Sequence, residues 1–195
     1  MKNIELFNTE INRIESEDLR SFVRYYLDEY TPDYFWEIGA SSSGKYHPAF
    51  SQGEGGLVRH TKAVCMFLEE LLRMNTYAFM QDEYKNYARV ACILHDTKKY
   101  GLTDFDKSEY DKHAVNASIA VNNAWVAFFG KPAPFLLTSA VRCHMGQWST
   151  DKDNRPFTNI DRCVHMADYM ASRSFIDIPQ ITEEYNAITE ENPPF

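Results

Sequence analysis

Residues 56–74, GLVRHTKAVCMFLEELLRM, decide the fold class of this chain. Their apolar side chains recur at the three- and four-residue spacing that places residues on one face of an α-helix. The positions on this face are Leu57, Val64, Phe67, Leu68 and Leu71. His60 falls on the same face, so the pattern predicts a long amphipathic helix with a histidine that points into the core.

Helical signals continue on both sides of this segment. Upstream, Ser16 is a suitable N-cap for a helix to about residue 30, and the Thr-Pro pair at 31–32 is typical of a further helix start. Downstream, Thr158 and Asp161 resemble a capping box. The periodic segments predict helices over about 82–95, 112–129, 132–144 and 158–175.

Polar segments separate these helices. Residues 39–55, 96–112 and 145–157 are expected to be loops, and the acidic tail 179–195 is expected to be weakly helical or frayed. No alternating strand pattern persists for more than a few positions. We therefore predict an all-α bundle of about seven helices in a single domain.

Composition excludes several classes of protein. The chain has 195 residues, 44% hydrophobic and 25% charged, which is ordinary for one globular domain. Its net charge of −8 disfavours binding to long nucleic acid. We find no signal-peptide pattern and no stretch suited to a membrane span. Four scattered cysteines without a C-x-x-C pair are expected to be reduced thiols of a cytoplasmic protein.

Several predicted helices carry one histidine or aspartate on an apolar face near an end. These residues are His60, His95, His113, His144 and Asp168, and Asp96 follows His95 directly. A buried carboxylate is costly unless it is paired or binds a metal, and helical bundles build metal sites from facing side chains. A set of separate core histidines with a salt-bridged Asp168 is the alternative. Imidazole and carboxylate ligands favour Fe, Mn, Zn or Co over Ca, and we expect Cys143 and Cys163 to pack as small apolar side chains.

The order of these residues resembles the HD-domain superfamily of metal-dependent phosphohydrolases. The resemblance rests on EGGLVRHT (54–61), ACILHDTKKYG (91–101), RCHMGQW (142–148) and HMADYMASR (165–173). It covers about residues 45–175 and implies an HD-type core there, with N-terminal helices and a loop over 1–44 packed on it and an acidic tail over 176–195.

The resemblance implies a set of metal ligands. One divalent ion would be held by His60, His95, Asp96 and Asp168, and a second by His113 and His144 with Asp96 bridging. Fe or Mn is the first expectation, with Zn, Co, Ni or Mg as others. A mononuclear site whose two extra histidines bind the substrate phosphate is the alternative.

The residues around the His-Asp pair depart from the family pattern. Lys99 takes the usual lysine position and is the candidate catalytic contact to phosphate, beside Asp96. Lys98 replaces a glycine and is expected at the surface. Met145 stands where the second histidine of the family's His-His-Gly segment would lie.

Other residues are weaker candidates for substrate binding. The stretch GASSSGKY (39–46) lacks the Ser or Thr and the flanking strand of a P-loop, so we reject that motif. Its neighbourhood resembles the segment before the same helix in HD-type 3′-to-5′ exoribonucleases, which makes Lys45 and His47 phosphate-binding candidates. Trp148 and Arg155 are candidates for stacking on a base and holding phosphate. His165 is expected to orient another residue or to pack in the core.

The predicted function is a metal-dependent phosphohydrolase acting through metal-activated hydroxide on a nucleotide phosphomonoester or phosphodiester. The net charge favours a small nucleotide over the 3′ end of short RNA, because contacts along a strand need a basic track. A non-catalytic HD-type module that binds a nucleotide and regulates a partner is the alternative. No membrane partner is expected.

Overall fold

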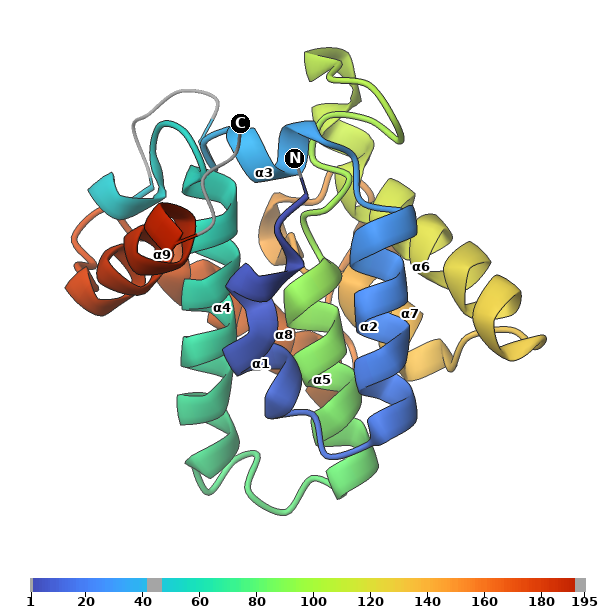
Figure 1. Ribbon diagram of the computed structural model, residues 1–195. Helices are drawn as coiled ribbons and strands as arrows, with labels where there is room; N and C mark the ends of the chain where they lie inside the picture. The colour runs from blue at the N-terminus through green and yellow to red at the C-terminus, as the bar shows by residue number, and fades with distance from the viewer. Residues whose placement is uncertain (1, 42–46, 192–195) are drawn as a thin grey trace.

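The computed structural model describes residues 2–41 and 47–191, and within these ranges it contains helices and no strand (Figure 1). The all-α prediction is therefore confirmed. The α-helices of the described residues are α1 (Asn8–Asn12), α2 (Glu17–Glu29), α3 (Tyr34–Glu37), α4 (Gly56–Arg73), α5 (Asp82–Leu94), α6 (His113–Phe129), α7 (Phe135–Arg142), α8 (Asn159–Ala171) and α9 (Pro179–Glu191). Short 3₁₀ helices complete the fold: η1 (Ile4–Phe7), η2 (Ala49–Ser51), η3 (Lys107–Lys112), η4 (Gly146–Trp148) and η5 (Lys152–Asn154).

The centre of the bundle is α5, which packs against α4, α7 and α8. Its residues 90–94 are all buried, because neighbouring helices enclose this end of α5. In Figure 1, α2 lies beside α5 and α6 lies at the periphery, and the packed pairs include α2 with α5 and α6 with α7. This arrangement brings the start of α4, the end of α5 and the start of α6 toward one region.

Local sequence signals explain several helix ends. The Ser16 hydroxyl accepts from the Leu19 amide at 3.4 Å, and Thr158 and Asp161 form the predicted capping box. Gly130 ends α6 in the left-handed region at φ +71°. The expected start at Pro32 lies two residues before α3, which begins at Tyr34. The expected start at Pro132 and Pro134 is close to the observed one, because Pro134 is the N-cap of α7.

The C-terminal segment is helical, which is one of the two alternatives expected for it. Residues 179–191 form α9, whose Ile181 is buried and whose Tyr185 ring lies 4.7 Å from the Arg59 guanidinium of α4. Tertiary packing on α4 therefore stabilises a segment whose own helical pattern is weak.

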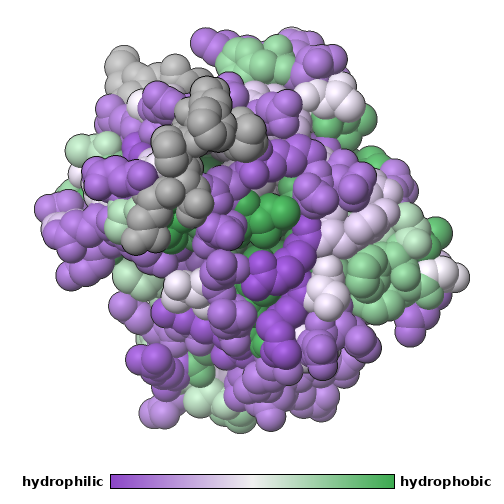
Figure 2. Space-filling view, viewed as in Figure 1, coloured by the Kyte–Doolittle hydropathy of each residue, from purple (hydrophilic) through white to green (hydrophobic). Residues whose placement is uncertain are grey.

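The face seen in Figure 2 is mainly hydrophilic. Figure 2 shows hydrophilic side chains over most of the face in view, with apolar side chains gathered at its right, where α6 lies. Exposed residues of α6 include Ile119, Val126 and Phe128. Among the described residues, no helix is both long enough and apolar enough to cross a membrane.

Candidate metal centre

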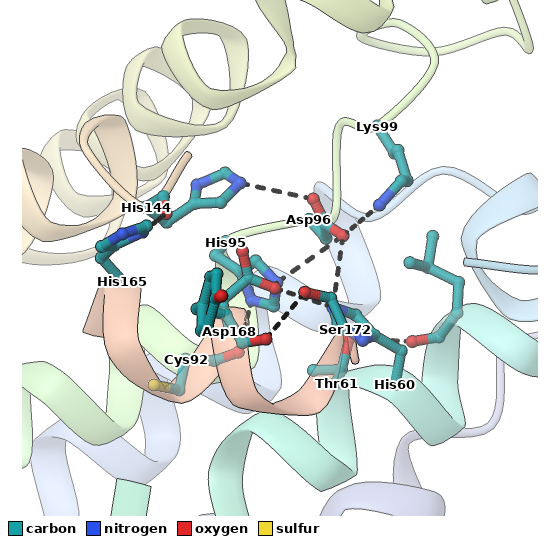
Figure 3. Close-up of polar contacts among 12 residues, drawn as sticks. His60, Thr61, Cys92, His95, Asp96, Lys99, His144, His165, Asp168 and Ser172 are labelled. Carbon is teal, nitrogen blue, oxygen red and sulfur yellow. Dashed lines mark hydrogen bonds and ion pairs between the residues drawn. The ribbon is translucent and has the colours of Figure 1, made fainter. Parts of the chain in front are cut away.

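Six polar side chains meet inside the bundle at the ends of its helices. Figure 3 labels all of them except His113. His60 lies in the second turn of α4, His95 and Asp96 follow α5, and His113 opens α6. His144 lies just after α7 and Asp168 lies in α8. Five of the six are buried, whereas the Asp168 side chain is 17% exposed. The cluster therefore reaches solvent at Asp168.

The two carboxylates organise the cluster. Asp168 Oδ1 lies 3.0 Å from His60 Nε2 and 3.8 Å from His95 Nε2. The two oxygens of Asp96 face different histidines. Oδ1 lies 3.2 Å from His113 Nε2 and 3.5 Å from His144 Nε2. Oδ2 lies 3.6 Å from His95 Nε2 and 3.9 Å from His60 Nε2. Two groups of three, His60–His95–Asp168 and His95–Asp96–His144, each have their ligand atoms within 4.8 Å of one another.

Backbone carbonyls set the tautomers of three histidines. His95, His113 and His144 each donate from Nδ1 to the carbonyl three residues earlier, at 2.8, 2.5 and 2.7 Å. Because a carbonyl only accepts, Nδ1 holds the proton, and Nε2 of the neutral ring presents a lone pair to the cluster. The Nε2 atoms of His113 and His144 lie 3.0 Å apart, so two lone pairs face each other unless a cation or proton lies between them.

These atoms fit a divalent metal. Ligand nitrogen and oxygen atoms about 2.0–2.2 Å from one ion lie about 3.0–3.6 Å from each other, which matches most of the separations within the cluster. His95 Nε2 and Asp96 Oδ1 are buried without a hydrogen-bond partner in the described part of the chain. Imidazole with carboxylate suits Fe, Mn, Zn or Co.

Burial and charge fix the protonation states. Burial lowers the pKa of His95 to about 4 and also lowers the pKa of His113. Burial alone would raise the pKa of Asp96, but the Lys99 ammonium and neighbouring histidines outweigh it, so the pKa is well below its usual range. The pKa of Asp168 is lowered in the same way by His60. Ionised carboxylates and neutral imidazoles are the forms that bind metal ions.

His144 behaves differently from its neighbours. Burial opposes protonation of its ring, but the facing Asp96 carboxylate outweighs burial and raises the pKa of His144. Without a metal, His144 is therefore the imidazole of this cluster best placed to hold a proton between itself and Asp96.

The two lysines after Asp96 have different environments. Lys99 Nζ contacts Asp96 Oδ2 at 2.5 Å, so its buried ammonium neutralises a candidate ligand. The surface prediction for Lys98 is wrong. Its side chain is buried, and Nζ donates to the carbonyls of Tyr30 and, at 2.7 Å, Leu102. Burial lowers the pKa of Lys98 to about 8.

The weaker candidates fall in different places. The His47 ring lies 5.2 Å from the His60 ring, and its Nδ1 is buried without a partner among the described residues. Burial lowers the pKa of His47 to about 3. Lys45 lies outside the described residues, as does most of the P-loop-like stretch. Arg155 is exposed and donates to the Ser149 carbonyl at 3.5 Å.

His165 orients the backbone of a cluster residue. Its Nδ1 donates to the His144 carbonyl at 2.7 Å, in line with its expected orienting role. The close approach needs Gly146, because a Cβ at that residue would lie 2.0 Å from His165 Cε1 and its φ is +59°. Cys143 and Cys163 are buried free thiols whose pKa values burial raises to about 11 and about 12.

Sequence reasoning missed two residues beside the cluster. The rings of Trp148 and Tyr169 stack at 5.4 Å with 13° between their planes, and the Arg173 guanidinium lies 4.2 Å from the Tyr169 ring. The four-residue spacing from His165 to Tyr169 to Arg173 was the available signal, because it places these side chains along one side of α8 and its extension.

A family model described as HD domain matches residues 57–173, which is more than half of the chain. The match includes all six clustered residues. No curated protein and no solved structure gives a significant match to the chain.

Proposed function

This chain belongs to the HD domain family of metal-dependent phosphohydrolases, and on that premise we propose that it hydrolyses a phosphate ester of a nucleotide. The observation that carries the proposal is the convergence of four imidazoles and two carboxylates with their Nε2 and Oδ atoms directed at one another. Such a donor set, buried except at Asp168, is suited to divalent cations and not to core packing alone.

We assign the six clustered residues as metal ligands. His60, His95 and Asp168 form one side, and His113 and His144 form the other. Asp96 supports a two-ion arrangement, because its two oxygens face the two sides separately. Fe or Mn is the proposed metal. When bound, divalent ions at such a site lower the pKa of water and neutralise phosphate charge.

The surrounding residues hold and position the substrate. Lys99 keeps the Asp96 carboxylate ionised and oriented, and it is the proposed catalytic contact to phosphate beside Asp96. His47, next to His60, is a proposed phosphate contact together with Lys45. Trp148 is proposed to stack on the base, and Arg155 to hold phosphate. The acidic balance of the chain favours a small nucleotide over an RNA strand.

The first test is the metal content and activity of Asp96→Asn. Because Asp96 faces both halves of the cluster, we expect the loss of at least one ion per chain and a fall in kcat/KM of about 10³-fold or more. Elemental analysis of protein purified without chelator gives the metal count, and Asp153→Asn is a matched control at an exposed aspartate. Full metal content and full activity in Asp96→Asn would rule out the assignment.

The second test separates the alternatives. About two ions per wild-type chain supports the two-ion site, whereas about one supports a mononuclear site with His113 and His144 on phosphate. Turnover of a nucleotide panel, compared with an oligonucleotide at several salt concentrations, distinguishes a small substrate from short RNA. Tight nucleotide binding with no metal and no hydrolysis would instead identify a regulatory module.

We propose a cytoplasmic location. The support is chemical: the four cysteines are buried free thiols, as expected in a reducing compartment.

A further inference from the structure

Three side chains form one layered surface beside the candidate metal centre. We call Trp148, Tyr169 and Arg173 the aromatic stack. The Trp148 and Tyr169 rings are nearly parallel, and the Arg173 guanidinium lies 4.2 Å from the Tyr169 ring and 5.5 Å from the Trp148 ring. Arg173 is held in place by bonds from Nε to the Tyr169 carbonyl at 3.0 Å and from Nη2 to Ser172 Oγ at 2.8 Å.

The stack is linked to the cluster along the backbone of α8 and through His165. Tyr169 follows Asp168, the cluster residue whose carboxylate is partly exposed. On the other side, the Trp148 ring lies 6.0 Å from the ring of His165, whose Nδ1 donates to the His144 carbonyl. The stack is therefore joined to two proposed ligands, one through α8 and one through the loop after α7.

The exposure of Trp148 is unusual for this molecule. Trp148 is 47% exposed, whereas Trp36 and Trp125 are 5% and 4% exposed. Leaving an indole in water forgoes the stabilisation that its burial would contribute. The Arg173 guanidinium carries five N–H donors, of which its two hydrogen bonds within the described residues use two. A planar group that has polar edges suits both features.

We propose that the aromatic stack binds the nucleobase of the substrate and so makes this enzyme prefer phosphate esters that carry a base. The inference rests on the proposed function, because it places the substrate phosphate at the metal centre. Stacking is tolerant of base identity, since every base has a π-face, and an arginine adds cation–π attraction and hydrogen-bond donors. The stack therefore selects for the presence of a base more than for one particular base.

Binding is tested without any phosphate chemistry. The probes are adenosine, guanosine, cytidine and uridine, with ribose as the base-free control, added to the metal-loaded protein. Because Trp148 is the exposed indole among three tryptophans, we expect the nucleosides to quench the solvent-exposed part of the emission saturably, and ribose to leave it unchanged. Trp148→Phe serves as the background for inner-filter and collisional effects and should show no such quenching.

Turnover tests the role of the stack in substrate choice. In Trp148→Leu and Tyr169→Leu, we expect kcat/KM for nucleoside monophosphates to fall about 5- to 100-fold. Turnover of ribose 5-phosphate should change by less than about twofold, since that ester has no base to stack. Trp148→Phe should keep most of the kcat/KM for nucleotides. Phe79→Ala, at an exposed aromatic residue after α4, should leave kcat/KM unchanged for both substrates.

The outcomes separate the two proposals. Two results would overturn the stack as a base site. One is that nucleosides fail to quench Trp148 fluorescence, and the other is that Trp148→Leu loses kcat/KM equally for nucleotides and ribose 5-phosphate. The stack would then be only a packing contact between η4 and α8. Saturable quenching with no hydrolysis of any ester would support the stack and count against the phosphohydrolase proposal. Hydrolysis of ribose 5-phosphate and nucleotides at equal rates would support hydrolysis and overturn the base site.

Discussion

At the residue scale, the helix ends explain why histidines gather in this core. The last carbonyls of an α-helix have no partner within the helix. His95 donates to Cys92 near the end of α5, and His144 donates to Val141 near the end of α7. Each bond satisfies a terminal carbonyl and at the same time turns Nε2 toward the cluster. The same contact therefore stabilises the helix end and orients a proposed ligand.

The buried histidines predict the acid sensitivity of the metal-free protein. The pKa of His95 is about 4 and that of His47 about 3 in the folded state, against 6.5 as the ordinary value. Between pH 6.5 and 4 the unfolded chain binds more protons, so the free energy of unfolding should fall as the pH is lowered through this window. For His95 alone the loss is about 3 kcal/mol.

Denaturant unfolding of chelator-treated protein at a series of pH values measures this effect. His47→Gln removes one of the titrating rings and should reduce the dependence on pH between 6.5 and 4. A free energy of unfolding that is constant or rises as the pH is lowered through this range would contradict the assignment of neutral, buried rings.

At the element scale, the Lys98 side chain joins the turn after α5 to the end of α2. Its Nζ donates to the Tyr30 carbonyl and to the Leu102 carbonyl, while the Tyr26 hydroxyl lies 3.0 Å from Thr97 Oγ1. The turn that carries Asp96 and Lys99 is thus held by a helix outside the HD domain match. The lysine at a family glycine position has a structural role here.

Lys98→Met should therefore loosen this turn. Two carbonyls lose a charged donor, and we expect destabilisation of about 2–4 kcal/mol together with weaker metal binding, because Asp96 is two residues away. Chemical denaturation and metal titration measure the two effects. Lys152→Met, at an exposed lysine, is the control and should alter neither quantity. Wild-type stability of the Lys98→Met protein would contradict the role of Lys98 in holding the turn after α5.

The long helices were predictable because periodicity and caps agree in them. The short α1 and α3 were missed or misplaced, since segments of five and four residues carry too little periodic signal and depend on packing. The six clustered residues could be singled out because each lies on an apolar face. Tyr169 and Arg173 were missed, because their spacing from His165 marks only one side of α8, whereas their importance comes from Trp148, which a loop brings across α8.

At the scale of the whole molecule, the segments outside the HD domain match close the bundle around α4. Buried Lys62 of α4 donates to the Leu6 carbonyl at 2.7 Å and to both carboxylate oxygens of Glu10, at 2.9 and 3.0 Å. It also reaches Glu184 of α9 at 3.2 Å. One ammonium therefore joins the N-terminal helices, the helix that carries His60, and the C-terminal helix.

This network predicts a large and specific loss of stability in Lys62→Met. The variant leaves the buried Glu10 carboxylate without its cation, which costs about 3–5 kcal/mol. Lys62→Met/Glu10→Met removes the uncompensated charge and should recover most of that loss, since a buried ion pair replaced by apolar groups is often near neutral. Lys112→Met is the matched control, because Lys112 pairs with Glu109 at the same 2.9 Å but is 66% exposed, and the free energy of unfolding of this variant should stay close to that of the wild type.

Chemical denaturation of the wild type, the two single variants and the double variant tests whether the unpaired Glu10 charge causes the loss of stability. If the double variant is no more stable than Lys62→Met, the loss comes from packing around α4 and not from the Glu10 charge. The metal content of each variant is a second measurement, which tests whether the terminal segments affect the metal centre. Because Lys62 lies two residues from His60 on a helix that the rest of the bundle still holds, each variant should keep its wild-type metal stoichiometry at temperatures where it stays folded. Loss of metal from the folded Lys62→Met protein would mean that the terminal segments position the metal centre as well as close the bundle.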